Sequence, residues 1–364
     1  MAIEKDIYSD LPIPPGEYFA EVLKEKGISQ AEIARRMGRP AQAINEIIRG
    51  QKAITSETAL QLERSLGVPA HIWIGLEVRY RLIKARQLEM RQLRKDLPLL
   101  TQIPYQNLAR MGFVKKTRNK LDQIRELHRF FGVSALSNIA DVKAYVPAFR
   151  LARRRNASPY ALVAWLKCAE ILAQETQAKS FNKESLHSSI PKIRELTLEP
   201  PDVFKSKLEK MLSDCGVAVV FMPHLPKTYA HAAAFWLAEE KAVIVISIRG
   251  SWADIFWFSL FHELAHILLQ KKHQTFIDDG EVSPEMQGQE EEANSLAKDQ
   301  LIHPDDYQRF ISLSSLTANS IREFANQVGI APGIVVGRLQ HDGHLRQDSR
   351  LNMLRERFKW KLND

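Results

Sequence analysis

The residues with the most distinctive chemistry are two histidines and a glutamate in the run His-Glu-Leu-Ala-His, at positions 262–266. Histidines four positions apart lie on one face of an α-helix, so both imidazoles can bind the same metal ion. We therefore expect His262 and His266 to hold a divalent cation. Glu263 lies on the same turn and could take a proton from a water on that metal, as a general base. The alternative is a pair of core histidines that are hydrogen-bonded to the backbone.

The sequence around this motif predicts a buried helix. Ser251 and Asp254 have the spacing of a capping box, and apolar residues then recur up to Gln270 without a glycine or proline. Such a helix is apolar nearly all round, which is typical of a helix inside a domain. Unpartnered polar side chains in that helix would cost several kcal/mol. A bound metal would be a suitable partner for them.

A catalytic zinc site needs a third protein ligand and leaves one position open. A second helix is predicted to begin in the acidic run 290–292. We favour Glu290 as the ligand because Ala293 and Asn294 then share its face. The small alanine would allow close helix packing, and Asn294 could orient a ligating imidazole. The other two glutamates are weaker candidates, and an acidic first turn also stabilises a helix without any metal.

Three short apolar runs, 217–222, 232–237 and 242–248, predict strands. We expect the edge of their sheet to lie beside the metal-binding helix, where an extended substrate could pair with it. Candidate donors to the oxyanion that forms on an attacked carbonyl are Tyr229, His231, Arg249 and His341.

The chain from about Gly216 to Gly343 resembles the ImmA/IrrE-type metallopeptidases. The resemblance rests on four blocks in order, at residues 242–249, 254–266, 290–297 and 329–341. It implies a small α+β domain of the gluzincin type with one Zn²⁺ per chain. It also implies an endopeptidase that acts on a regulatory protein, such as a repressor or an antitoxin.

A second signal stands near the beginning of the chain. Ser29 and Glu32 have capping-box spacing at the start of a short helix that ends near Gly38, and another short helix is predicted over residues 41–49. Two such helices joined by a tight turn form a helix-turn-helix, although a plain helical bundle would share this pattern. Candidate base-reading residues are Gln42 and Asn45. Candidate phosphate contacts are Gln30, Arg35, Arg36, Arg39, Arg49 and Lys52.

From about Pro15 to Tyr80 the chain resembles the HigA-like branch of lambda-repressor-type (XRE) helix-turn-helix proteins. The matching residues include Pro15-Gly16-Glu17, Ser29-Gln30 and the run from Ile54 to Leu62. The resemblance implies a five-helix fold, a homodimer, and a protein that represses its own operon at a double-stranded operator. Pro40 departs from the branch, because it provides no capping oxygen where serine or threonine is usual.

Composition favours a cytoplasmic protein. The chain has 364 residues, a net charge of +8 and two cysteines, Cys168 and Cys215, without metal-binding or disulfide-framework spacing. We expect no secretory signal, membrane span or membrane partner. Basic runs at 79–95, 115–120 and 150–155 would strengthen binding to a polyanion, or simply solvate helix faces.

We therefore predict a mainly α fold with an α+β C-terminal domain. The expected regions are a helix-turn-helix domain (1–80), a helical middle (81–205), a zinc metallopeptidase domain (206–345) and a basic tail (346–364). The main hypothesis is a DNA-binding regulator that cleaves a repressor or antitoxin in a stress, phage or toxin–antitoxin response. The alternative is an antitoxin-like autorepressor whose zinc domain is a sensor or scaffold. A third hypothesis is neutralisation of a cognate toxin.

Overall fold

The computed structural model describes residues 11–146, 148, 157–248, 252–269, 275–278, 287–313 and 315–359. The chain divides into two compact units, Met1–Lys95 and Asp96–Asp364. The described residues are mainly helical and include a small sheet, as the sequence predicts, and this sheet has four strands. None of the helices that they form combines the length and the apolar character needed to cross a bilayer.

The described part of the first unit, from residue 11 on, is a bundle of five helices around one apolar core. Its helices are α1 (Pro15–Glu25), α2 (Gln30–Met37), α3 (Ala41–Ile48), α4 (Ser56–Leu66) and α5 (Ala70–Lys95). Ile33, Ile44 and Trp73 are completely or almost completely buried at its centre. Their positions follow the apolar spacing of the sequence, because each amphipathic helix turns its apolar face inward.

Helix α1 crosses the end of α3 at very short range, and Gly16 makes this possible. A Cβ atom at Gly16 would lie 2.2 Å from the carbonyl oxygen of Ile47 and 2.3 Å from that of Ile48. Real Cβ atoms do not approach oxygen so closely, so any larger residue would push the two helices apart. The glycine therefore fixes the position of α3 against the bundle.

The boundary predicted at residue 80 falls inside α5, and the first unit ends at Lys95 instead. Glu77 ties this helix to the bundle, because its buried carboxylate accepts a hydrogen bond from the Ile54 amide at 3.0 Å and another from Arg81 Nε at 2.6 Å. The helix then continues without a break, since no glycine or proline follows Gly75 before its end.

The second unit surrounds the sheet with helices. Its α-helices are α6 (Leu97–Leu100), α7 (Tyr105–Arg110), α8 (Lys120–Phe131), α10 (Pro159–Glu175), α11 (Lys183–Glu195), α12 (Pro201–Asp214), α13 (Ala253–Leu269), α14 (Gln287–Leu301), α15 (Pro304–Leu313), α16 (Ala318–Val328) and α17 (Pro332–His341). Short 3₁₀ helices are η1 (Leu136–Asp141), η2 (Lys143–Tyr145), η3 (Leu196–Leu198) and η4 (Arg350–Leu354).

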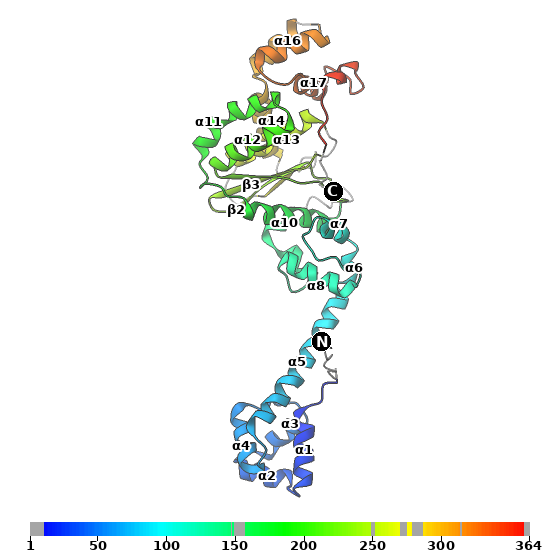
Figure 1. Cartoon of the computed structure of the whole chain (residues 1–364), viewed down its shortest axis with the longest axis vertical. Helices are drawn as coiled ribbons and strands as arrows, with labels where there is room; N and C mark the ends of the chain where they lie inside the picture. Colours follow the sequence, from blue (N-terminus) through cyan, green and yellow to red (C-terminus); the bar gives the residue numbers. More distant parts are fainter. Residues whose placement is uncertain are drawn as a thin grey trace, which may run out of the picture. The chain divides into compact units, whose positions relative to one another are not determined.

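The sheet has the strand order β1-β3-β2-β4. Its strands are β1 (Val217–Phe221), β2 (Ala232–Ala238), β3 (Lys241–Ile246) and β4 (Phe276–Asp278). Strand β1 runs parallel to β3, whereas β2 pairs antiparallel with both β3 and β4. Helix α10 covers one face of the sheet, and α12 and α13 cover the other (Figure 1). Three of these strands match the predicted runs closely, and β4 is additional.

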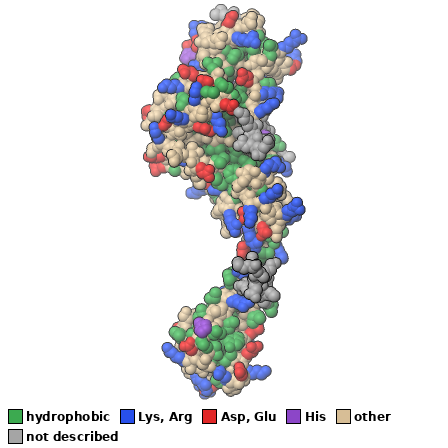
Figure 2. All heavy atoms as spheres, in the orientation of Figure 1, with side chains coloured by type: hydrophobic (Ala, Val, Ile, Leu, Met, Phe, Trp, Pro, Cys, Tyr) green, Lys and Arg blue, Asp and Glu red, His purple; other side chains and the backbone are tan. Residues whose placement is uncertain are grey.

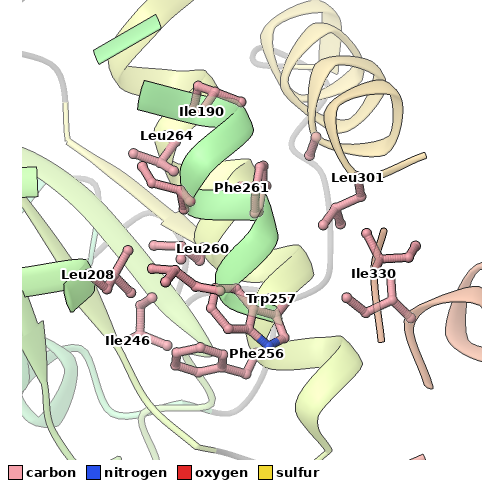
Figure 3. Packing of buried hydrophobic residues seen from close by; sticks show 14 of the residues in the cluster. Ile190, Leu208, Ile246, Phe256, Trp257, Leu260, Phe261, Leu264, Leu301 and Ile330 are labelled. Atoms are coloured by element: carbon pink, nitrogen blue, oxygen red, sulfur yellow. The ribbon is translucent and has the colours of Figure 1, made fainter. Parts of the chain in front are cut away.

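Helix α13 runs through the centre of the second unit. Figure 3 shows Phe256, Leu260 and Leu264 of this helix among side chains of other elements, including Ile190 of α11 and Leu208 of α12. Helices α11 and α12 thus share the core of the sheet and do not form a separate middle region. The predicted boundary at residue 205 lies inside α12. An amphipathic pattern shows that a helix has a buried face but does not identify what covers it.

The predicted basic tail is partly built into the core. Arg355 donates two hydrogen bonds to the buried carboxylate of Asp254, at 2.9 and 2.8 Å, and Phe358 is buried in the main cluster. Asp254, expected to cap α13, is thus held by a residue near the end of the chain. Ser251, the other residue of that capping box, lies outside the described residues, as do residues 360–364.

Candidate metal centre and nucleic-acid interface

Two histidines of α13 and one glutamate of α14 meet inside the second unit. The Nε2 atoms of His262 and His266 lie 2.9 Å apart, and Glu290 Oε2 lies 3.2 and 3.5 Å from them. Ligand atoms about 2.0–2.1 Å from a tetrahedral zinc ion are roughly 3.3 Å apart. The three separations fall around this value, so the donor atoms fit one metal ion of that kind.

The three donors are largely shielded from solvent and carry the right charge for a cation. His262 and His266 are 4 and 2% exposed, and the Glu290 side chain is 16% exposed. Burial acts to raise the pKa of Glu290, but hydrogen bonds from both histidines outweigh it and lower this pKa to about 2. The carboxylate is therefore ionised at neutral pH, which is the form that binds a metal.

Aromatic rings flank both imidazoles. The ring of Phe276 on β4 stacks on His266, with centroids 4.2 Å apart and planes at 10°, and Phe258 stacks on His262 at 6.1 Å and 30°. These contacts restrict how far each imidazole can turn. The sequence does not reveal the part played by Phe276, because a three-residue strand has no periodicity to detect.

The other predicted residues of this site have different surroundings. Glu263 follows His262 on the same helical turn and is completely buried. Glu291 is exposed and accepts a hydrogen bond from Gln287 at 2.8 Å, and Glu292 is also exposed. Asn294 lies one turn after Glu290 and is half-buried. Within the described residues, no hydrogen bond joins it to either imidazole.

The candidate oxyanion donors come from separate elements. Tyr229 and His231 lie in the segment before β2, where Tyr229 has a φ of 56°. His341 ends α17, and its ring centroid is 6.4 Å from that of Phe258. Arg249 lies outside the described residues.

In the first unit, α2 and α3 have the two-helix geometry that the sequence predicts. Ser29 Oγ accepts a hydrogen bond from the Glu32 amide at 3.2 Å, and Gly38 ends α2 with a φ of 63°. Helix α3 begins after Pro40 without a side-chain cap. Gln42 is exposed and Asn45 is half-buried, and Gln42 Nε2 donates to Glu46 at 3.0 Å.

Several candidate phosphate-binding residues are already paired within the unit. Glu32 binds Arg35 at 2.8 Å and Arg36 at 2.9 Å, and the hydrogen bond from Arg36 and the charge of Arg35 lower the pKa of Glu32. Arg39 donates to Gln61 at 2.6 Å and lies 3.4 Å from Glu57, both on α4. No pattern in the sequence points to these two α4 residues. The remaining candidates, which are all exposed, are Gln30, Arg49 and Lys52.

Basic side chains do not gather in one patch on the face of the molecule drawn in Figure 2. Lys and Arg are scattered there over both units and mixed with acidic residues. This view favours solvation of helix faces as the role of many basic residues. The run 150–155 lies outside the described residues.

Comparisons with known proteins concern a limited part of the chain. The HTH_3 family model, described as helix-turn-helix, matches residues 19–73. Virulence-associated protein I of Dichelobacter nodosus is 37% identical over 90 residues, which cover 24% of this chain and 82% of that protein. Through its N-terminal domain, the chain belongs to the helix-turn-helix family.

Solved structures similar to part of this chain include an addiction module antidote protein of the HigA family from Coxiella burnetii. It is 29% identical, covers 23% of this chain and 94% of its own, and has a TM-score of 0.22. Antitoxin HigA of Pseudomonas aeruginosa, solved with the higBA promoter, is 33% identical and has a TM-score of 0.22. The match covers 24% of this chain and 95% of the antitoxin. PA4674 of the same organism, solved with its operator DNA, is 37% identical and has a TM-score of 0.20. That match covers 21% of this chain and 82% of PA4674.

Proposed function

We propose that this protein is a DNA-binding transcriptional regulator whose second unit is a zinc-dependent endopeptidase. The regulator part is supported by the helix-turn-helix family match and by relatives solved with operator or promoter DNA. The enzyme part is supported above all by the convergence of His262, His266 and Glu290 next to a buried Glu263. The proposed substrate is a regulatory protein of the repressor or antitoxin class.

In this proposal one Zn²⁺ per chain is held by His262, His266 and Glu290. When bound, zinc polarises a peptide carbonyl and makes a water more acidic. Glu263 takes up a proton on its carboxylate and returns it to the leaving amine, which is general acid–base catalysis by one group.

The sheet could present a peptide to this centre. Strand β4 ends the sheet in the described part of the chain, and its Phe276 ring stacks on His266. An extended peptide that pairs with the outer edge of β4 would lie next to the imidazoles. Strand addition supplies affinity through main-chain hydrogen bonds, so it suits a protease that must bind an unfolded segment of its substrate.

The first unit would bind an operator through α3 in the major groove. Gln42 and Asn45 would read base edges, while backbone amides near Gln30 and exposed basic side chains would contact phosphates. A homodimer would present two such helices to the half-sites of a palindromic operator. Arg39 would have to leave Glu57 to reach a phosphate, so it contributes less to binding than the exposed residues.

A second candidate is favoured by the relatives that are named antitoxin or antidote proteins. In this case the protein is an autorepressor that binds a cognate toxin. Its metal centre would act as a sensor or as a scaffold for the fold, without catalysis. Both candidates need the same metal ligands, but the enzyme alone needs the carboxylate of Glu263.

The test that separates these candidates is the Glu263→Gln variant, studied as the full chain. Its zinc content should equal that of the wild type, because Glu263 is not a ligand in the proposal. Cleavage of a co-expressed repressor or antitoxin, followed by mass spectrometry, should disappear. Glu291→Gln is the matched control, since that exposed carboxylate is bound only by its neighbour Gln287 in the described structure. Zinc binding without cleavage by the wild type would favour the non-catalytic candidate, and equal cleavage in both chains would show that Glu263 is not the catalytic base.

A further inference from the structure

A cavity of about 250 Å³ lies between α13, α14 and α17 of the second unit. Its wall is mainly apolar, with Ile255 and Phe258 from α13 and Leu301 from α14. Two basic side chains, Lys298 and Arg338, also line it. None of these five residues is assigned a part in DNA binding or in the proposed hydrolysis.

The cavity and the metal centre share the same faces of two helices. On α13, Phe258 lies one turn before His262, which in turn lies one turn before His266. On α14, Leu301 lies three turns after Glu290. Residues four apart lie on one helix face, and one turn rises about 5.4 Å. Each helix thus carries one stripe of side chains that leads from the metal ligands to the cavity.

The charges at the cavity leave an excess of positive charge. Arg355 and Asp254 neutralise each other through two hydrogen bonds. Arg338 and Lys298 share the carboxylate of Asp342, at 2.5 Å from Arg338 Nε but 3.8 Å from Lys298 Nζ. Among the described residues, no other carboxylate approaches Lys298 within 4 Å. These two cations are therefore balanced by one anion.

We infer that this cavity is a binding site for a carboxylate carried on an apolar stem. The carboxylate would lie against Lys298 and Arg338, and the stem against Ile255, Phe258 and Leu301. Such a group could be the acidic side chain of a peptide or a free organic acid, since both present the same chemistry. A carboxylate suits the site because Asp342 neutralises only one of the two positive charges of Lys298 and Arg338. The negative charge of the ligand would neutralise the other.

Phe258 connects such a ligand to the metal centre. Its ring lies 6.1 Å from the His262 ring and 6.4 Å from the His341 ring, with planes at 30° in both pairs. A stem packed on Phe258 therefore contacts the side chain that stacks on a candidate metal ligand. The ligand would be recognised beside the metal without binding to it.

The test is a calorimetric titration of the full chain with hexanoate and with hexanamide, which has nearly the same shape but no charge. Hexanoate should bind at a ratio of one per chain, at least about tenfold more tightly than hexanamide, as expected for a charge-assisted hydrogen bond. Lys298→Met, which keeps the length of the side chain, should weaken hexanoate binding about tenfold and leave hexanamide nearly unchanged. Lys207→Met is the control, because that lysine lies on α12, outside the cavity, and pairs with Glu199.

The same titrations in the Glu263→Gln chain separate this site from the proposed peptidase activity, because binding is then read without turnover. A blocked peptide Ala-Glu-Ala, compared with Ala-Gln-Ala, identifies the source of the acid. Tighter binding of the glutamate peptide than of the glutamine peptide indicates that the ligand is a peptide side chain. If hexanoate binds more tightly than hexanamide but the two peptides bind alike, the ligand is a free organic acid. Both results support the site. Equal binding of hexanoate and hexanamide, no binding of either, or unchanged affinity in Lys298→Met would overturn it.

Discussion

The two units carry their candidate sites in opposite ways. In the first unit, side chains such as Gln42 and Arg49 are exposed on the outside of the helical bundle. In the second unit, His262, Glu263 and His266 lie within the core itself. A surface site can change without loss of the fold, whereas a buried polar site must be balanced by partners from other elements. This difference predicts which variants lose binding alone and which also lose stability.

The largest effect is expected where the metal ligands are removed. Glu290→Gln should weaken zinc binding by more than about 100-fold, since even the loss of an outer partner of a ligand costs about 10–100-fold. The measurement is zinc content after dialysis against a graded series of chelator concentrations. Glu291→Gln, one position along α14, should behave as the wild type. Equal zinc retention by both variants would show that Glu290 is not a ligand.

A similar dependence on partners is expected at the pair of Asp254 and Arg355. Arg355→Met leaves a buried carboxylate unpaired, so the free energy of unfolding of the second unit should fall by about 3–5 kcal/mol. Chemical denaturation followed by tryptophan fluorescence measures this loss. The double variant Asp254→Leu with Arg355→Met should recover most of it, because no buried charge then remains.

The pH dependence of this variant gives a further check. Burial raises the pKa of the Asp254 carboxyl, and the opposing hydrogen bonds from Arg355 do not fully compensate. A carboxyl with a higher pKa in the folded chain binds its proton more tightly there, so acid favours the folded state. Without Arg355 this effect grows. The loss of unfolding free energy in Arg355→Met should therefore be greatest at neutral pH and shrink towards about pH 4. A loss that grows in acid would contradict the pairing of Arg355 with an ionised Asp254.

In the first unit, a change of packing should act on that unit alone. Gly16→Ala places a Cβ against the backbone of α3 and should cost about 1–3 kcal/mol of stability, with weaker DNA binding and unchanged zinc content. The control is Gly75→Ala on α5, where an added Cβ meets nothing within 4 Å. That change should stabilise the helix by roughly 0.5–1 kcal/mol. A loss of zinc in Gly16→Ala would show that the two units do not respond separately.

The smallest effects on stability are expected from the candidate DNA-contacting residues. Asn45→Ala should reduce discrimination between an operator and a site with one changed base pair by about 1–3 kcal/mol, with little change in the melting temperature. Lys52→Ala should weaken binding to all sequences alike and lower the salt dependence by about one phosphate contact. Fluorescence anisotropy at several salt concentrations distinguishes these results. The reverse pattern would exchange the roles of the two residues.

Local signals explain what the sequence could predict. The cap at Ser29, the glycine at Gly38 and the histidines at i and i+4 all act within one or two helical turns, and the first two have their predicted roles in the structure. Glu290 could be chosen because Ala293, one turn later on α14, is small enough for two helices to meet. Local spacing thus points to the three side chains whose donor atoms converge between α13 and α14.

Long-range packing explains which features of the fold could not be predicted from the sequence. Arg355 and Asp254 are 101 positions apart, and a salt bridge over that distance leaves no pattern in the sequence. Strand β4 is too short to have one. Helices α11 and α12 have ordinary amphipathic patterns, which could not indicate that they cover α13. The predicted boundaries at 80 and 205 fall inside α5 and α12 for the same reason, because a boundary depends on which faces pack together.

The central claim is that side chains from α13 and α14 hold one metal ion, and crystals of the full chain measured at the zinc absorption edge test it most directly. The account predicts one strong anomalous peak per chain, about 2 Å from His262 Nε2, His266 Nε2 and a Glu290 oxygen. A crystal grown with zinc that shows no peak there, or a peak held by other residues, would contradict it.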